Sequence, residues 1–113
     1  MKQSKWFASI PKSDIEAAAE ESFVDAYGDH EQHTGVLTMI DERLGFPFRG
    51  KVIGREVSVV GMEWPDDEFG LDLIVFGEDG ERHRIAAAGV EPLDPFPDGV
   101  EFLALYFEWR GRF

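Results

Sequence analysis

The chain contains no cysteine among its 113 residues, which excludes disulfides, thiolate catalysis, iron–sulfur clusters and zinc sites built from cysteine. A metal site would therefore use oxygen or histidine ligands. The segment before Pro11 has too few apolar residues for a signal-peptide core, and no apolar run reaches the ~18 residues that a membrane span needs. We therefore expect a cytoplasmic protein with no membrane partner.

Basic residues are scarce, with 11 Lys and Arg against 23 Asp and Glu, which gives a formal net charge of −12. Such a charge attracts cations and basic partners, and it repels nucleic-acid phosphates and anionic lipids. We expect no nucleic acid among the partners. Because acidic composition also serves solubility alone, the charge by itself leaves a specific cation site as one of two explanations.

The sequence also lacks the patterns of common enzyme classes. No serine lies in a nucleophile-elbow setting, and no glycine-rich phosphate loop is present. Pairs of carboxylates that could act as acid and base are not singled out by any pattern. We therefore predict that the protein is not an enzyme.

The composition nevertheless predicts a folded protein. Apolar residues make up 43% and aromatic residues 13% of the chain, which is far too many for a disordered acidic tail. The length is enough for one hydrophobic core but too short for two independent ones. We predict a single domain over residues 1–113.

The first half of the chain has helical patterns. Ser13 and Glu16 form an S-x-x-E capping box after Pro11, and the alanine-rich run that follows predicts a helix to about residue 27. Gly28 interrupts this helix. Apolar residues then recur at helical spacing up to Gly45, so the pattern predicts an N-terminal helix or a kinked helix pair.

The second half changes to short β-branched or alternating runs, which predict antiparallel strands. These runs cover residues 49–54, 55–64, 71–76 and 82–89. The Asp79–Gly80 dipeptide is typical of a type I′ hairpin turn, which predicts that the last two runs pair. Asp98 and Glu101 then indicate the start of a C-terminal helix. The predicted fold class is α+β, with a small antiparallel barrel-like sheet between helices.

The first candidate ligand pair is Asp41 and Glu42, in the last turn of the second predicted helical segment. Carboxylates are unfavourable at this end of a helix because its carbonyl groups carry partial negative charge. A hard cation would reverse that penalty by taking the carboxylate oxygens as ligands. The alternative is that Arg43 and solvent neutralise the two carboxylates.

The second candidate group is Asp66, Asp67 and Glu68, on a loop bounded by Pro65 and Gly70. Three successive carboxylates can direct several oxygens to one point, and oxygen is the ligand that Ca²⁺ prefers. The alternative is a solvated loop tip. Neither acidic group follows the EF-hand pattern, so a calcium site here would be assembled from separate elements.

The three histidines give weaker patterns. His30 and His33 are spaced for one helix face, but HEQH is not the HExxH of zinc hydrolases, and we interpret this pair as a solvated face. His83, between two arginines in a predicted strand, is interpreted as an outward-facing residue.

The segment FVDAYGDHEQHTGVLTMIDERLGFPFRGKVI, followed by REVSVVGM, resembles the cyanobacterial-type calcium-binding protein family. The matching pieces are VDAYG, the acidic helix end DERL, the FPF turn and a strand that ends in VVGM. VDAYG and FPF at this separation form a moderately specific signature, whereas either one alone would be weak.

The resemblance implies a helix packed on an SH3-like half-open barrel, a C-terminal helix, and Ca²⁺ held by surface acids without an EF-hand. The family's acidic pair falls on Asp41 and Glu42, where Glu42 replaces an aspartate that the resemblance makes the main ligand. The role of the family's acidic loop falls on Asp66, Asp67 and Glu68, although the loop length differs.

The residues and the resemblance together predict a calcium-ion buffer or sensor with calcium as the bound ion. The alternative is a non-catalytic, acidic interaction module of SH3-like fold. Such a module would bind a basic protein partner or imitate nucleic acid, and its binding would not depend on calcium.

Overall fold

The structure is a computed structural model that describes residues 6–24, 26–64 and 70–110. The chain forms two compact units. We call residues 1–44 and 98–113 the helical unit and residues 45–97 the sheet unit. The helical unit therefore contains both ends of the chain, and the sheet unit is a single continuous segment.

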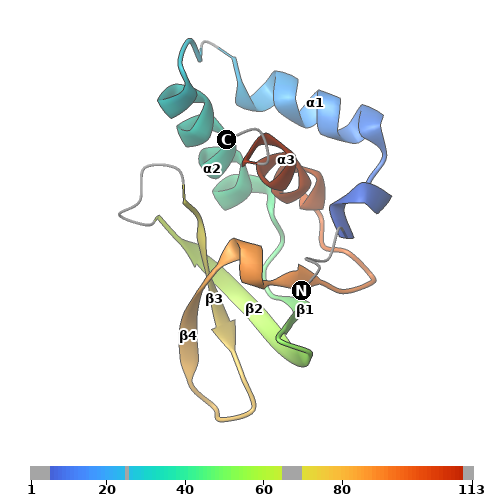
Figure 1. The fold of residues 1–113 in the computed structure, drawn as a ribbon, viewed down its shortest axis with the longest axis vertical. Coiled ribbons are helices and arrows are strands. Elements are labelled where there is room, and N and C mark those ends of the chain that lie inside the picture. The colour runs from blue at the N-terminus through green and yellow to red at the C-terminus, as the bar shows by residue number, and fades with distance from the viewer. Residues whose placement is uncertain (1–5, 25, 65–69, 111–113) are drawn as a thin grey trace. The chain divides into compact units, whose positions relative to one another are not determined.

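The helical unit consists of one short 3₁₀ helix and three α-helices in the described residues (Figure 1). They are η1 (Trp6–Ser9), α1 (Lys12–Ser22), α2 (Asp29–Arg43) and α3 (Val100–Arg110). The predicted helices are confirmed, as two separate N-terminal helices and a C-terminal one. The structure corrects the first boundary, since α1 ends at Ser22 instead of continuing to residue 27.

The predicted capping box at the start of α1 is wrong. The helix begins at Lys12 with Pro11 as its N-cap, and no side chain caps it. Ser13 therefore lies inside the first turn, where its hydroxyl cannot take the N-cap role. Pro11 favours this earlier start because its fixed φ is compatible with a helix entry.

The core of the helical unit is centred on α3, which packs against α1, α2 and η1. Buried apolar side chains come from each α-helix: Ile15, Ala18, Val36, Leu37, Ile40, Phe102, Leu103 and Ala104. Five successive residues of α3, from 102 to 106, are buried. A helix that is apolar around its whole circumference must be covered on several sides, which explains the position of α3 among the other helices.

Two glycines let backbone segments of the helical unit approach closely. A Cβ atom at Gly35 of α2 would lie 2.1 Å from the carbonyl oxygen of Ser22 at the end of α1. A Cβ atom at Gly99 would lie 2.2 Å from the carbonyl oxygen of Arg43, at the end of α2. Only glycine leaves room for these two contacts, so they fix where α1 and α3 meet α2.

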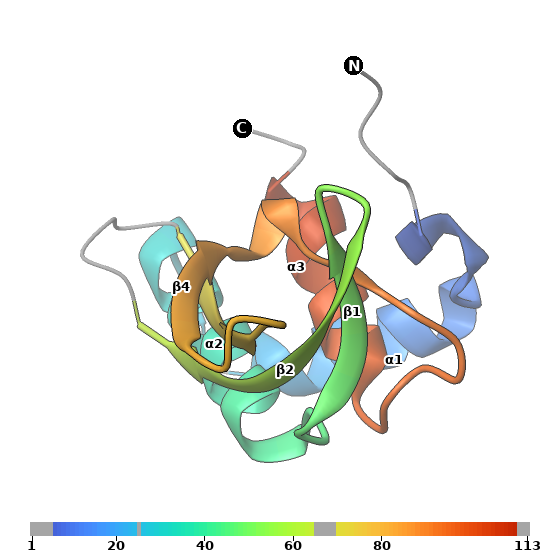
Figure 2. The same ribbon diagram turned by 90° about the horizontal axis from the view of Figure 1, so that it is seen from below.

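The sheet unit is a five-stranded antiparallel sheet with the order β4-β3-β2-β1-β5. Its strands are β1 (Phe48–Val52), β2 (Arg55–Glu63), β3 (Asp72–Phe76), β4 (Arg82–Ala86) and β5 (Glu91–Pro92). The sheet curls strongly along β2 (Figure 2), and a register shift between Val59 and Gly61 marks an irregularity in that strand. Such irregularities increase local twist and bend. The sequence predicted four of the strands and missed β5.

The described residues of the sheet unit include two hairpin turns at paired strand ends, and the one that the sequence predicted differs from the prediction. Ile53 and Gly54 form the two-residue turn, with φ of 50° and 75°, between the paired ends of β1 and β2. Between β3 and β4, Gly80 has φ of 75° as expected, but its N–H donates to the Gly77 carbonyl inside a five-residue connection. The predicted pairing is confirmed, but the predicted two-residue turn at Asp79–Gly80 is wrong.

The described residues thus form three α-helices and a five-stranded antiparallel open sheet, which confirms the α+β class. Among these residues, no helix combines the length and the apolar character needed to cross a membrane.

Candidate metal centre

Asp41 and Glu42 lie in the last turn of α2, and both side chains are exposed. The helix closes directly after them, where the N–H of Leu44 donates to the Ile40 carbonyl at 2.9 Å. Within residues 6–24, 26–64 and 70–110, neither carboxylate has an ion-pair partner. The two charges therefore lie at the negative end of the helix dipole, and no basic side chain of the described residues forms an ion pair with them.

Arg43 does not neutralise this pair. Its Nη2 atom lies 3.3 Å from Glu21 Oε1 of α1, and its guanidinium carbon lies 5.9 Å from the centre of the Phe102 ring. The guanidinium group of Arg43 thus interacts with a carboxylate and with the face of an aromatic ring. The structure thus gives Arg43 a place in the packing of the helical unit, and it leaves Asp41 and Glu42 available to a cation.

Asp66, Asp67 and Glu68 lie outside the described residues. Their predicted convergence with Asp41 and Glu42 on one ion therefore stays a prediction. Strand β2 ends at Glu63 and β3 begins at Asp72, so these three residues fall in the sequence between two strands that pair with each other.

The interpretation of His33 as a solvated residue is wrong. Its side chain is 3% exposed, and its ring stacks on Trp109 of α3 at 5.5 Å between centroids. His30 is exposed. The three-residue spacing turns the two rings to different environments because α2 presents one narrow buried stripe to α3. His33 is thus a core residue of the helical unit.

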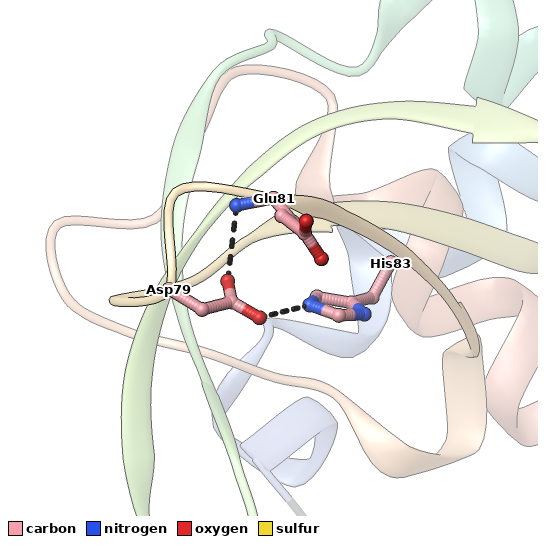
Figure 3. Close-up of side chains that lie close together, drawn as sticks. All are labelled: Asp79, Glu81 and His83. Atoms are coloured by element: carbon pink, nitrogen blue, oxygen red, sulfur yellow. Dashed lines mark hydrogen bonds and ion pairs between the residues drawn. The ribbon is translucent and has the colours of Figure 1, made fainter.

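A group of potential metal ligands that the sequence analysis did not identify lies on the β3–β4 hairpin. Asp79, Glu81 and His83 each offer one ligand atom, and these atoms all lie within 4.8 Å of one another (Figure 3). Asp79 Oδ1 accepts the Glu81 backbone N–H at 3.0 Å, and Asp79 Oδ2 lies 2.7 Å from His83 Nε2. We call these three residues the hairpin triad.

The electrostatics of the hairpin triad favour the charged form of Asp79. Its pKa is lowered, first because the Glu81 N–H donates to the carboxylate and second because the His83 ring does so. A carboxylate that stays ionised over a wider pH range is a better ligand for a cation. His83 is exposed, as predicted, but Arg82 and Arg84 are exposed as well, so exposure does not alternate in this part of β4.

A signal for the hairpin triad was present in the sequence. Three potential metal ligands follow one another at every second position, Asp79, Glu81 and His83, of which the first lies in the turn and only the last lies in β4. The Asp79–Gly80 dipeptide predicted a turn, and the sequence analysis gave Asp79 no role as a ligand.

An apolar groove of about 360 Å³ adjoins the hairpin triad within the sheet unit. Asp79 and His83 form part of its wall, together with Val57, Val75 and Ile85. Ile53 also lines the groove, and its side chain is 92% exposed. The sheet unit therefore combines an apolar recess with titratable groups on one side, an arrangement typical of ligand sites.

Comparisons with known proteins identify the fold. No protein-family model and no curated protein matches the chain. Among solved structures, the crystal structure of CcbP from Anabaena is similar with a TM-score of 0.72 and 22% identity, over 88% of this chain and 90% of that one. The chain shares its fold with CcbP.

A second similar structure is a calcium-binding protein in its calcium-binding form. Its TM-score is 0.68 and its identity 25%, over 91% of this chain and 93% of that one. Both CcbP and this second structure extend the likeness through nearly the whole chain. The resemblance to a calcium-binding protein family, which the sequence predicted, is confirmed by these two structures.

Proposed function

We propose that this protein binds calcium ions through carboxylates on its surface, as a buffer or sensor and not as an enzyme. The observation that carries the proposal is the likeness, over 91% of the chain, to a calcium-binding protein in its calcium-binding form. The net charge of −12 acts in the same direction, because a bound dication relieves part of the repulsion among carboxylates. We place this activity in one cytoplasmic domain over residues 1–113, with the sheet as an SH3-like half-open barrel.

Asp41 and Glu42 are the ligands for which the described residues give the most support. Both carboxylates are exposed at the C-terminal end of α2, and Arg43 is engaged by Glu21. A hard cation there would interact with two carboxylates and with the negative end of the helix dipole. These donors are oxygens, which fits calcium and leaves out the softer ligands that transition metals favour.

Asp66, Asp67 and Glu68 complete the proposed ligand set. Ca²⁺ takes six to eight oxygen ligands, which is more than one pair of carboxylates supplies. Three further acidic residues in one loop supply that kind of donor. Sites assembled from surface carboxylates bind in the weak part of the calcium range, on the order of micromolar to millimolar, and lose affinity with salt.

Calcium titration by calorimetry at low salt tests the proposal. We expect Glu42→Gln and Asp41→Asn each to weaken calcium binding, since each removes one charged oxygen donor from a hard cation. Glu20→Gln is the matched control, because Glu20 is an exposed acid on α1 and the substitution changes the net charge equally. Equal loss in Glu42→Gln and Glu20→Gln would reduce the effect to general screening and would remove Glu42 from the site.

The second candidate function is a non-catalytic, acidic interaction module. Such a module would bind a basic protein or imitate nucleic acid. The apolar groove beside Asp79 and His83 favours it, because apolar surface with acidic groups nearby suits a basic segment with an apolar side chain. Thermal unfolding in calcium, in magnesium and in EGTA separates the two functions. Selective stabilisation by calcium supports calcium binding, and equal unfolding temperatures in all three support the interaction module.

A further inference from the structure

The donor chemistry of the hairpin triad differs from that of the proposed calcium site. Asp79 and Glu81 offer carboxylate oxygens, whereas His83 offers an imidazole nitrogen. Ca²⁺ takes oxygen ligands, and imidazole suits zinc, copper, nickel and cobalt. Zinc accepts both histidine nitrogen and carboxylate oxygen, and its open sites use three protein ligands and leave a fourth position free.

The local backbone brings these three donors together. The Glu81 N–H donates to Asp79 Oδ1 in the turn, and Glu81 directly precedes β4, which carries His83, so the ligand atoms of the three residues lie within 4.8 Å of one another. Arg84 lies one residue beyond His83 and pairs with Asp72 at 2.6 Å and with Glu63 at 3.4 Å. Arg84 therefore pairs with two carboxylates outside the triad.

The groove is a second observation, independent of how the three side chains meet. Asp79 and His83 line it beside Val57, Val75 and Ile85, so two of the three ligands border apolar surface. Charges attract each other more strongly where water is partly displaced by apolar groups. The groove also gives the open coordination position room for a water molecule or for a ligand with an apolar part.

We infer that the β3–β4 hairpin holds a second metal site, in which Asp79, Glu81 and His83 bind a transition-metal ion of the zinc class. The ion replaces the direct contact between His83 Nε2 and Asp79 Oδ2, and the neutral imidazole binds it through a ring nitrogen. All three ligands belong to the sheet unit, so the site requires no residue of the proposed calcium site. The fold likeness to calcium-binding proteins does not supply this site.

Zinc calorimetry on the full chain, in saturating calcium, tests the site. Calcium occupies the oxygen-only ligands, so that added Zn²⁺ reports on sites that contain nitrogen. We expect one Zn²⁺ per chain, and we expect His83→Asn to lower the affinity by at least ~10-fold, the effect of losing even an outer partner of a metal ligand. His30→Asn is the matched control, because His30 is also exposed and lies on α2.

The visible absorption of bound Co²⁺ gives a second measurement, which is spectroscopic and not calorimetric. Co²⁺ bound to the hairpin triad should show visible absorption that Zn²⁺ removes, and Asp79→Asn and Glu81→Gln should each weaken it. Thermal unfolding without metal checks that the variants fold. Unchanged zinc affinity in His83→Asn, or an equal loss in His30→Asn, would overturn the inference, and both results are independent of whether calcium binds.

Discussion

Glycine has different tasks in the helical unit and in the sheet unit. At Gly35 of the helical unit, φ is ordinary for a helix, but a neighbouring backbone atom occupies the place of a side chain. At Gly54 and Gly80 of the sheet unit the reverse holds, since there is open space but φ is positive. Gly99, in the helical unit, has both a backbone atom where a side chain would lie and a positive φ. The helical unit thus depends on close contact between helices, whereas the sheet unit depends on local turn conformation.

The difference extends to how each unit uses its surface. In the helical unit, His33 and Trp109 are taken into the core, and Arg43 is taken into helix packing. In the sheet unit, Asp79 and His83 stay at the surface beside an open groove. Polar groups that packing does not use are the ones available to ligands. The following substitutions test this contrast.

Gly99→Ala should have the largest effect. The new Cβ would overlap the Arg43 carbonyl and lie 2.9 Å from Leu44 Cα, and φ of +81° is unfavourable for alanine. We expect a loss of more than ~3 kcal/mol in the free energy of unfolding, from overpacking and left-handed strain together. Urea unfolding measures it, with Gly54→Ala as a control that has the strain but not the overlap. Equal losses in the two variants would contradict the contact at Gly99.

Gly35→Ala should have the next largest effect. We expect it to lower the free energy of unfolding, whereas helix propensity alone would raise it. Alanine in the middle of a helix is favoured over glycine by ~1 kcal/mol. The overlap with the Ser22 carbonyl, 2.1 Å from the new Cβ, should outweigh this gain and leave a net loss of about 1–2 kcal/mol. Thr34→Ala, at an exposed neighbouring position of α2, is the control. A more stable Gly35→Ala variant would show that α1 and α2 are not held this closely.

Ile53→Asn should stabilise the sheet unit. Ile53 has φ of 50° and is 92% exposed, so its side chain gains little from packing while its β-branch disfavours this backbone. Asparagine before Gly54 matches the preferred sequence of a type I′ turn, and we expect a gain of ~0.5–1 kcal/mol. Thermal unfolding measures it. A loss of stability would indicate that Ile53 has a packing role beside the groove.

Arg49→Gln should have the smallest effect on stability, and its effect should be detected as a change in the pKa of Glu56. Glu56 on β2 pairs with Arg49 on β1, and its pKa is lowered chiefly because Arg49 donates a hydrogen bond to it. The stabilisation from a lowered pKa is present above the unfolded-state pKa and is lost as the pH falls through the folded-state pKa. In Arg49→Gln the pKa of Glu56 should rise toward its ordinary value, as measured by NMR of its carboxyl carbon. A pKa that stays low in the variant would assign the shift to another neighbour such as Lys51.

The sequence predicted most of the elements but few of their ends. Alternating β-branched runs identified β1 to β4, and apolar spacing identified α2 and α3. The capping box of Ser13 and Glu16 was wrong because Pro11 starts α1 earlier. Glu91–Pro92 was missed because a two-residue strand is defined by its partner β1 and not by its own composition.

The candidate sites show a similar division. Asp41 and Glu42 were predicted at a helix end, and the structure places them there, exposed. The hairpin triad was not predicted, because each of its residues had a plausible explanation when taken singly. Whether Arg43 neutralises the acidic pair also depended on Glu21, which is 22 positions away in the chain.

By itself, the sequence determined the net charge, the lack of thiol ligands, the α+β class and the excess of carboxylates available to a hard cation. These properties follow from composition and from local periodicity, and local periodicity depends only on residues that are close in the sequence. Only the tertiary structure decided that His33 is buried, that Arg43 is engaged, and that Asp79 and His83 border a groove. Each of those outcomes depends on residues that are distant in the chain and meet only when helices or strands pack together.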